Sequence, residues 1–428
     1  MGNDRIVYIR TDGNSHIASG HLVRCISIAL ACRSLGMDVC FLVSDTESFL
    51  LLKELLNAQE LPDSHCSYRN TNGGTGPNTA FLPGQITALR LKTAQYNNLE
   101  KELPEIISLL TLPGHHSGFV YDSHDIYVIN SEDNAGHIND TSVTNTPGRE
   151  KYQQIIYLTD SYFVTGQYLS ALTPLAKTVY IDDLQAFDYP VDMIINYDVI
   201  SPSDMPAYQR AYLKADRLLL GASYTPLRSQ FMHKQITVKE QPADILITTG
   251  GSDPFHFCLS FLTRLSRYLN GGKKHLPNAQ ANAPGHAVVF HIVIGKLNAD
   301  REKLRQAARS LSCLELHENV SDMASLMGKC DIAVSAAGTT LYELCALGVP
   351  SISFTMADNQ LTAAKAFESV GAVPCAGDLR TNQETVFEAV FHFIGKCSYE
   401  ERKATHATMR SLVDGKGSLR IASAIKEL

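Results

Sequence analysis

The beginning of the chain has the pattern of a strand, a helix and a second strand. An apolar run at Arg5–Arg10 precedes a polar loop, apolar residues recur at helical spacing over His21–Leu35, and another apolar run covers Val39–Ser44. Gly36 follows the predicted helix, at the position where helices commonly end in glycine. Two strands joined by one helix form a parallel, right-handed crossover. The pattern therefore predicts an open, parallel α/β sheet.

A similar pattern fills the second half of the chain. Apolar runs at Asp244–Thr248, Ile332–Ser335 and Ser351–Phe354 alternate with helix-patterned segments. The 428 residues are enough for two domains with separate cores. We therefore predict an α/β protein with two Rossmann-like lobes facing a cleft. The N-terminal lobe is expected at residues 1–225 and the C-terminal lobe at 242–428, with the last helices able to pack back toward the N-terminal lobe.

Two polar tracts interrupt the predicted N-terminal lobe. The tract near residues 64–85 is rich in Asn, Gly, Thr and Pro, and the tract at 131–150 is also polar. Neither has the apolar periodicity of a helix or strand, so we expect both to be surface insertions or long loops.

Composition and charge narrow the classes of partner. The net charge is −7 and no basic tract stands out, which disfavours a nucleic-acid partner. No apolar run approaches the roughly 20 residues of a membrane span, and the N-terminus has no signal-peptide pattern. The ten cysteines are scattered without a Cys-x-x-Cys pair, which is typical of buried thiols. We expect a cytoplasmic protein that binds neither nucleic acid nor a membrane, and the sequence indicates no oligomeric state.

Gly20 and His21 stand where the first predicted helix begins. The first turn of a helix has unpaired N–H groups that attract an anion, and the positive helix end favours a neutral imidazole that can accept a proton. Arg24, one turn later, could face the same anion. These residues alone leave two interpretations open: His21 is a general base beside an anion site, or it caps the helix or bonds a neighbouring loop.

Acidic residues end two predicted strands of the N-terminal lobe. Asp160 follows the strand at Gln154–Leu158, while Asp182 and Asp183 follow the strand at Thr178–Ile181. Ligands of doubly wound sheets bind at the carboxyl ends of strands, so Asp160 is a candidate cleft residue. For Asp182 and Asp183 we favour the commoner use of aspartate, the capping of a turn or of a following helix.

A glycine-rich turn begins the second lobe. Gly250, Gly251, Ser252 and Asp253 follow a predicted strand and lead into a helix. Paired glycines let backbone N–H groups approach a phosphate closely, although such turns also serve as plain connections between a strand and a helix.

Two further turns of this lobe carry candidate binding residues. Around Gly338 the small side chains leave room for a diphosphate, and Thr339 and Thr340 supply hydroxyl and N–H donors. Glu343 could accept hydrogen bonds from ribose hydroxyls, or it could only complement the helix dipole. Asn359–Gln360, at the next junction, have amides that suit the hydroxyl and amide groups of a sugar.

Together these motifs resemble the two-lobed glycosyltransferase-B architecture. More narrowly, they resemble the hydrolase family of pseudaminic acid biosynthesis, which cleaves UDP-2,4-diacetamido-2,4,6-trideoxy-β-L-altropyranose into UDP and the free sugar. The loop at Gly20–His21, the turn at Gly250–Asp253 and the segments 336–350 and 357–360 carry the first resemblance, and the segments 9–12 and 20–25 carry the second. It extends over Arg5–Leu56 and about Tyr157–Val373, and it is weak in the polar tracts and at the C-terminus.

The resemblance implies roles for individual residues. It places the catalytic base at His21 and a substrate-facing residue at Tyr162. Ser161 stands where the family has a histidine, so the resemblance assigns that position no role. Glu343 matches the family's uridine-ribose acceptor, and Asn359–Gln360 match its sugar-contacting pair.

The implied reaction is an inverting hydrolysis of a UDP-sugar. His21 would deprotonate a water that attacks the anomeric carbon opposite UDP, while N–H donors near Gly251 and Thr339 hold the diphosphate. UDP is already a good leaving group, so we expect no metal and no cofactor. The alternatives are a glycosyltransferase with a UDP-sugar donor and a non-catalytic nucleotide-sugar-binding protein. The sequence has no basic amphipathic face that would dock on a membrane, so water is favoured over a lipid as the acceptor of the sugar. The presence of His21 argues against the non-catalytic alternative.

Overall fold

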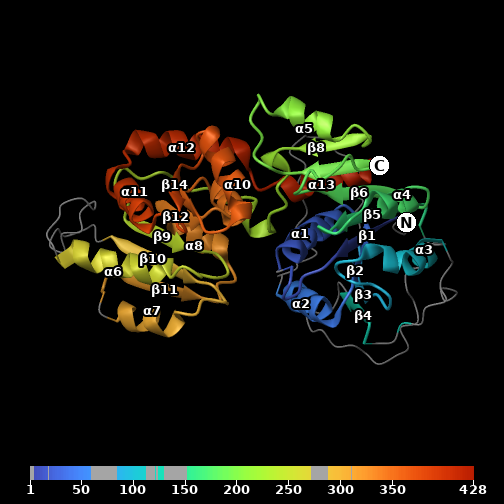
Figure 1. The fold of residues 1–428 in the computed structure, drawn as a ribbon, viewed down its shortest axis with the longest axis horizontal. Helices are drawn as coiled ribbons and strands as arrows, with labels where there is room; N and C mark the ends of the chain where they lie inside the picture. Colours follow the sequence, from blue (N-terminus) through green and yellow to red (C-terminus); the bar gives the residue numbers. More distant parts are fainter. Residues whose placement is uncertain are drawn as a thin grey trace, which may run out of the picture. The chain divides into compact units, whose positions relative to one another are not determined.

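The computed structural model describes residues 4–17, 19–58, 84–111, 121, 124–129, 152–270, 288–309 and 311–428. The chain divides into two compact units (Figure 1). Unit 1 comprises Met1–Tyr197, Asp204–Leu220 and Gly417–Leu428, and unit 2 comprises Asp198–Ser203 and Gly221–Lys416. Apart from residues 84 and 85, the two predicted polar insertions lie outside the described residues.

Unit 1 is built on an eight-stranded sheet with the order β4-β3-β2-β1-β5-β6-β7-β8. Its strands are β1 (Arg5–Thr11), β2 (Asp38–Val43), β3 (Ile86–Arg90), β4 (Ile126–Ile129), β5 (Gln154–Asp160), β6 (Lys177–Ile181), β7 (Met193–Asn196) and β8 (Arg217–Leu220). Neighbouring strands are parallel except β3 and β4, which are antiparallel. The parallel pairing of β1 with β2 confirms the crossover predicted from the sequence.

The helices of unit 1 pack apolar side chains against this sheet. They are α1 (Gly20–Ser34), α2 (Thr46–Asn57), the 3-10 helix η1 (Leu99–Glu102), α3 (Leu103–Thr111), α4 (Gly166–Leu172), α5 (Met205–Ala211) and α13 (Gly417–Lys426). β1 and β2 are buried along nearly their whole length, as expected of central strands with both faces covered.

Unit 2 contains a six-stranded sheet with the order β11-β10-β9-β12-β13-β14. The strands are β9 (Asp244–Thr248), β10 (Val289–Ile294), β11 (Leu314–Glu318), β12 (Ile332–Ala336), β13 (Ser351–Thr355) and β14 (Cys375–Asp378), and all neighbours are parallel. In chain order this arrangement is 3-2-1-4-5-6, the strand order of a Rossmann fold. The two predicted Rossmann-like lobes are therefore confirmed as one fully parallel sheet and one that is parallel except for the β3–β4 pair.

The remaining elements of unit 2 surround that sheet. They are η3 (Ala222–Tyr224), η4 (Ser229–Phe231), α6 (Phe257–Asn270), α7 (Arg301–Ala308), α8 (Met323–Lys329), α9 (Thr340–Leu347), α10 (Asp358–Ser369), α11 (Gln383–Lys396) and α12 (Tyr399–Leu412). In the core, the ring of Phe257 stacks on Phe354 and Phe387 with centroid distances of 4.1 and 4.9 Å. These contacts fix α6 and α11 against β13, because stacked aromatic pairs add to the energy of apolar burial.

The sequence predicts last helices that belong to the C-terminal lobe and are able to pack back toward the N-terminal lobe. Gly417–Leu428, expected in the C-terminal lobe at 242–428, belongs to unit 1, where α13 packs beside α1 (Figure 1). Ile421 and Ile425 of α13 are fully buried, and Lys426 Nζ donates to the carbonyl oxygen of Leu35 at 2.8 Å. Unit 2 also takes in Asp198–Ser203 and resumes at Gly221, so residues 198–203 and 221–225, which were expected in the N-terminal lobe at 1–225, belong to it. An amphipathic pattern predicts that a helix packs, but it does not identify the sheet on which it packs.

The described part of the chain contains no helix that is both long and apolar enough to cross a membrane. Its cysteines are thiols, and most of them are buried, as expected from their apolar sequence surroundings.

Candidate functional site

The sheet of unit 1 has a topological switch point between β1 and β5. From β1 the chain proceeds to β2 on one side, whereas from β5 it proceeds to β6 on the other. The connections after these two strands therefore diverge at the carboxyl ends of the strands, the usual place of the ligand in an open α/β sheet. The loop after β1 leads to His21 in the first turn of α1, and Asp160 is the last residue of β5.

His21 and Asp160 form a hydrogen-bonded pair at this switch point. The Nδ1 atom of His21 lies 2.6 Å from Oδ1 of Asp160, and both side chains are buried. An ionised carboxylate can only accept, so Nδ1 carries the proton and donates it. The lone pair of the ring is then on Nε2, which is buried and has no hydrogen-bond partner among the described residues. His21 therefore presents a basic nitrogen with a fixed tautomer.

Arg24 holds the carboxylate of this pair in its ionised form. Its Nε and Nη2 atoms donate to Asp160 at 2.7 and 2.5 Å, Nη2 lies 2.8 Å from Asp183, and Nη1 bonds the hydroxyl of Tyr197. Burial alone would raise the pKa of Asp160, but the charge and hydrogen bonds of Arg24 and His21 outweigh burial and hold that pKa well below its usual range. Arg24 thus positions the His21–Asp160 pair.

The two aspartates after β6 have different roles. Asp182 accepts hydrogen bonds from the N–H groups of Leu184 and Gln185 and from the hydroxyls of Tyr189 and Tyr212, so the expected turn-capping role is confirmed. Asp183 instead pairs with Arg24 (above), which corrects the expectation that it caps a turn.

Tyr162 lies against the imidazole. Its ring packs edge-to-face on His21 with a centroid distance of 4.5 Å, and the tyrosine is 47% exposed. Ser161 is largely buried and shapes the turn: its carbonyl accepts from Tyr180 at 3.1 Å, and its hydroxyl accepts from the N–H of Phe163 at 3.2 Å. Tyr162 therefore covers His21 from the solvent side.

A row of aromatic rings continues from this turn. His16 stacks on Tyr96 with centroids 5.3 Å apart, and Tyr96 packs edge-to-face on Phe163 at 5.8 Å. His16 and Phe163 are exposed. Sequence reasoning did not find this row, because its members come from three separate loops with no local motif.

A buried ion network fixes the loop that precedes α1. The fully buried Arg10 donates from Nε to both oxygens of Glu102 at 2.8 and 2.9 Å and from Nη1 to Asp12 at 2.6 Å. Asp12 also accepts from the N–H of Ser44 at 2.7 Å. This network ties the ends of β1 and β2 to η1. Removing one partner of such a network leaves an unpaired buried charge, at a cost of about 3–5 kcal/mol.

The sheet of unit 2 has its own switch point, between β9 and β12. The Gly250–Gly251 turn follows β9 and the turn at Gly338 follows β12, so the structure brings these two predicted binding turns to the same edge of the sheet, at the carboxyl ends of neighbouring strands. Gly250 has φ +81°, which requires glycine, and an added Cβ at Gly250, Gly251 or Gly338 would meet no atom within 4 Å. The backbone of both turns therefore borders open space.

Gly295 supports the first of these turns. A Cβ at Gly295 would lie 2.3 Å from the carbonyl oxygen of Gly250, and the N–H of Leu297 donates to the carbonyl of Gly251 at 2.9 Å. Only glycine permits this approach of β10 to the turn.

The side chains of this turn point in different directions. Asp253 is 4% exposed and accepts from the N–H groups of Phe257 and Cys258 at 2.8 and 2.9 Å. Its carboxylate therefore caps the start of α6, whereas Ser252 is exposed.

Glu343 lies in the first turn of α9, after Thr339 and Thr340. Neither threonine side chain caps the helix, whose start is therefore open to a ligand. Oε1 of Glu343 accepts from Nη2 of Arg228 at 2.8 Å. Burial raises the pKa of Glu343, and the charge of Arg228 opposes that shift. Sequence reasoning missed Arg228, because 115 residues separate it from its partner.

Asn359 and Gln360 lie in the first turn of α10, which follows β13, the neighbour of β12 in the sheet. Asn359 is exposed, whereas Oε1 of Gln360 accepts from the N–H of Met356 at 2.8 Å. This hydrogen bond to Met356 uses the amide oxygen of Gln360 and leaves its amide nitrogen as the group that could donate to a ligand.

The chain is similar in sequence to known proteins. Residues 245–416 match the glycosyltransferase family 28 C-terminal domain. The chain is 27% identical to the spore coat polysaccharide biosynthesis protein SpsG of Bacillus subtilis (strain 168) over 242 residues, which are 55% of this chain and 65% of SpsG.

A second relative is a Helicobacter pylori (strain ATCC 700392 / 26695) protein described as pseudaminic acid cytidylyltransferase and UDP-2,4-diacetamido-2,4,6-trideoxy-beta-L-altropyranose hydrolase. It is 26% identical over 219 residues, which are 50% of this chain and 36% of the relative. The chain thus spans less than two thirds of the length of either relative.

The solved structures agree on the fold. Acinetobacter baumannii MurG superposes with a TM-score of 0.56 at 12% identity, covering 99% of this chain and all of MurG. The chain therefore has a two-lobed fold of the glycosyltransferase-B type, and residues 245–416 in its second unit match the glycosyltransferase family 28 C-terminal domain.

Proposed function

We propose that this protein is an inverting, metal-independent hydrolase of a UDP-linked diacetamido-trideoxy sugar. The substrate we propose is UDP-2,4-diacetamido-2,4,6-trideoxy-β-L-altropyranose, and the products are UDP and the free sugar. The reaction belongs to the biosynthesis of nonulosonic (pseudaminic) acid. The Helicobacter pylori relative, which carries this hydrolase in its name, supports the choice of substrate.

One observation carries the proposal: the unpartnered Nε2 of His21 beside an aspartate that fixes the tautomer. A general base needs a lone pair within reach of the proton it removes and a neighbour that stabilises the imidazolium once it forms. Asp160, kept ionised by Arg24, meets the second requirement.

The proposed reaction is one displacement at the anomeric carbon. Nε2 of His21 takes a proton from water while the water oxygen forms a bond to the anomeric carbon. The bond between that carbon and the β-phosphate oxygen breaks, and UDP leaves with the electron pair. The water attacks opposite the leaving group, so the configuration at the anomeric carbon inverts.

We assign nucleotide binding to unit 2. Backbone N–H groups at Gly250, Gly251 and Gly338, with Ser252, Thr339 and Thr340, would hold the diphosphate, since open helix ends and glycine turns bind anions. Asp253 would keep the first turn in shape.

The remaining candidates would recognise the rest of the substrate. Glu343, oriented by Arg228, would accept from the ribose hydroxyls. We assign sugar contacts in unit 2 to Asn359 and Gln360, and a substrate-facing role beside His21 in unit 1 to Tyr162 and the turn at Gly20.

A glycosyltransferase that uses a UDP-sugar donor is the second candidate. The match of residues 245–416 to a glycosyltransferase domain favours this candidate. The same nucleotide site can serve either reaction. The two candidates differ in whether water or another molecule accepts the sugar.

Release of UDP without an acceptor separates these functions. The purified chain would be incubated with the UDP-altrose derivative and, separately, with UDP-N-acetylglucosamine, and NMR would follow UDP and the anomeric configuration. The hydrolase should release UDP and the inverted free sugar from the first substrate in buffer alone. If UDP appears only after an acceptor is added, the protein is a transferase.

A further inference from the structure

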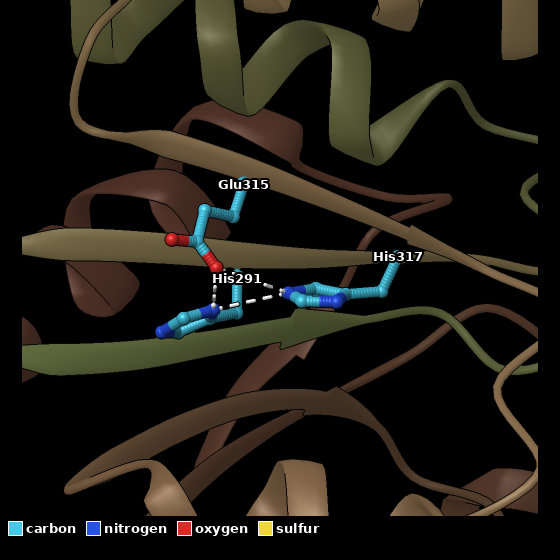
Figure 2. Close-up of side chains that lie close together, drawn as sticks. All are labelled: His291, Glu315 and His317. Atoms are coloured by element: carbon cyan, nitrogen blue, oxygen red, sulfur yellow. Dashed lines mark hydrogen bonds and ion pairs between the residues drawn. The ribbon is translucent and has the colours of Figure 1, made fainter.

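Two histidines and a glutamate converge on one point in unit 2, on strands β10 and β11. Parallel pairing sets His291 opposite Glu315 and Val293 opposite His317. Residues two apart on a strand share a face, so all three side chains lie on the face opposite Phe290 and Ile292, which belong to the core. Figure 2 shows the two rings and the carboxylate turned toward one another.

The facing atoms are all potential electron-pair donors. Nδ1 of His291 lies 3.0 Å from Nε2 of His317 and 3.3 Å from Oε2 of Glu315, and the last two atoms are 3.8 Å apart. Glu315 is largely exposed, whereas His291 is almost fully buried. The point of convergence is thus reachable from solvent but anchored on a buried ring.

Asp244 on β9 orients the buried ring. Nε2 of His291 lies 2.9 Å from Oδ1 of Asp244, and it donates its proton to that carboxylate. Nδ1 therefore carries a lone pair, and it faces the oxygen of Glu315, which also only accepts. In the metal-free chain Nδ1 can accept from the N–H of His317 Nε2 at 3.0 Å, and a metal ion bound at this point would take the place of that proton.

We propose that His291, Glu315 and His317 form a binding site for a divalent transition-metal ion, with zinc as the ion that fits best. Two imidazole nitrogens and one carboxylate oxygen are a common protein ligand set for zinc. Tetrahedral ligands about 2.0–2.1 Å from zinc lie about 3.3 Å from one another, within about half an ångström of the three separations here.

The surroundings agree with the ligand set. A metal-ligating histidine usually donates its other N–H to a carboxylate, as His291 does to Asp244. β11 is an edge strand of the sheet, so an ion at this point would join the edge to its inner neighbour β10. The fourth coordination position would be filled by water. This inference is independent of the proposed hydrolase reaction.

Binding of cobalt to the full chain tests the site, because tetrahedral Co²⁺ absorbs visible light and replaces zinc. The chain would be stripped with a chelator, reduced, and titrated with Co²⁺ and, by calorimetry, with Zn²⁺. The wild-type chain should bind one equivalent of metal ion, and His317→Ala should bind none. Glu315→Gln, at an exposed position that tolerates the change, should weaken binding at least about ten-fold. Asp244→Asn should weaken binding about 10–100-fold by disturbing the orientation of His291.

His233→Ala is the matched control, because His233 is an exposed histidine of the same unit. It should keep the full equivalent and the visible spectrum. Zinc should raise the melting temperature of the wild type and of His233→Ala, but not that of His317→Ala. The proposal is overturned if Glu315→Gln and a folded His317→Ala both bind Co²⁺ as tightly and in the same amount as the wild type.

Discussion

Nδ1 of His21 donates to Oδ1 of Asp160 across 2.6 Å, although 139 residues separate them in the chain. The two side chains meet because β1 and β5 are neighbours at the point where the strand order reverses. Asp160 is in turn held by Arg24, so the ring is fixed through two successive contacts.

Replacing His21 tests the general base. His21→Ala should lower kcat for the UDP-altrose derivative by about 10²–10⁴-fold, which is the contribution of a positioned general base. No other described histidine is hydrogen-bonded to Asp160 and could replace it. UDP should bind as tightly as in the wild type, measured by calorimetry. His392→Ala, an exposed histidine of α11, is the control and should keep full turnover. Retention of more than about a hundredth of wild-type kcat in His21→Ala would refute the assignment.

Asp160 acts through His21 and should affect kcat but not binding. Asp160→Asn should reduce kcat by about 10- to 10⁴-fold, the upper value being the effect of the same change in a Ser-His-Asp triad. The reason is that the asparagine amide no longer fixes the tautomer of His21. KM should change little. Asp183→Asn is the matched control, since Asp183 bonds Arg24 but not His21. Equal kcat losses in the two variants would indicate that only the Arg24 contacts matter.

Asp160 should also link stability to pH. Its pKa is depressed in the folded protein, so the stability that it contributes is present above the unfolded value of about 3.9 and is lost as pH falls below that value. Protonated aspartate has the same charge as asparagine. The free energy of unfolding in urea should therefore differ most between the wild type and Asp160→Asn at pH 7, by about 3–5 kcal/mol. The difference should narrow below about pH 4. A constant difference from pH 7 to pH 3 would contradict this expectation.

Local patterns predicted the framework of both sites. Apolar runs followed by helical periodicity located β1, α1, β9 and α9 to within a few residues, because buried parallel strands and their crossover helices have strong sequence signals. The rule that ligands bind at the carboxyl ends of strands then selected Asp160. Its pairing with His21 needed the order of the strands in the sheet, which the sequence does not state.

Side-chain partners were the part that the sequence could not supply. Arg24 and Arg228 each meet a carboxylate more than 100 residues away, and no spacing rule connects such pairs. Asp253 illustrates the opposite problem, since an aspartate in a glycine-rich turn suits a ligand contact and a helix cap equally well. His291 and His317 lie on adjacent strands without a metal-binding motif.

Glu343 should recognise the ribose and not the phosphates. Glu343→Gln should raise the Kd of UDP about ten-fold or more, the value of a hydrogen bond to a charged group, because the amide has one accepting oxygen where the carboxylate has two and Arg228 loses its charged partner. The Kd of inorganic pyrophosphate should stay unchanged. Arg228→Met should weaken UDP binding in the same direction by releasing Glu343. Glu388→Gln, an exposed change on α11, provides the control. Equal weakening of UDP and pyrophosphate would assign Glu343 to the phosphates instead.

Gly338 should be needed for the ligand and not for the fold. A Cβ at Gly338 meets no protein atom within 4 Å, so Gly338→Ala should leave the melting temperature of the free protein within a few degrees of the wild type. The added methyl group would occupy space that we assign to the diphosphate, and the Kd of UDP should rise at least about ten-fold, because a well-packed site cannot absorb an extra carbon cheaply. Gly328→Ala is the matched control, since its Cβ also meets open space, but on α8. That variant should bind UDP normally. If Gly338→Ala binds UDP as Gly328→Ala does, the diphosphate lies elsewhere.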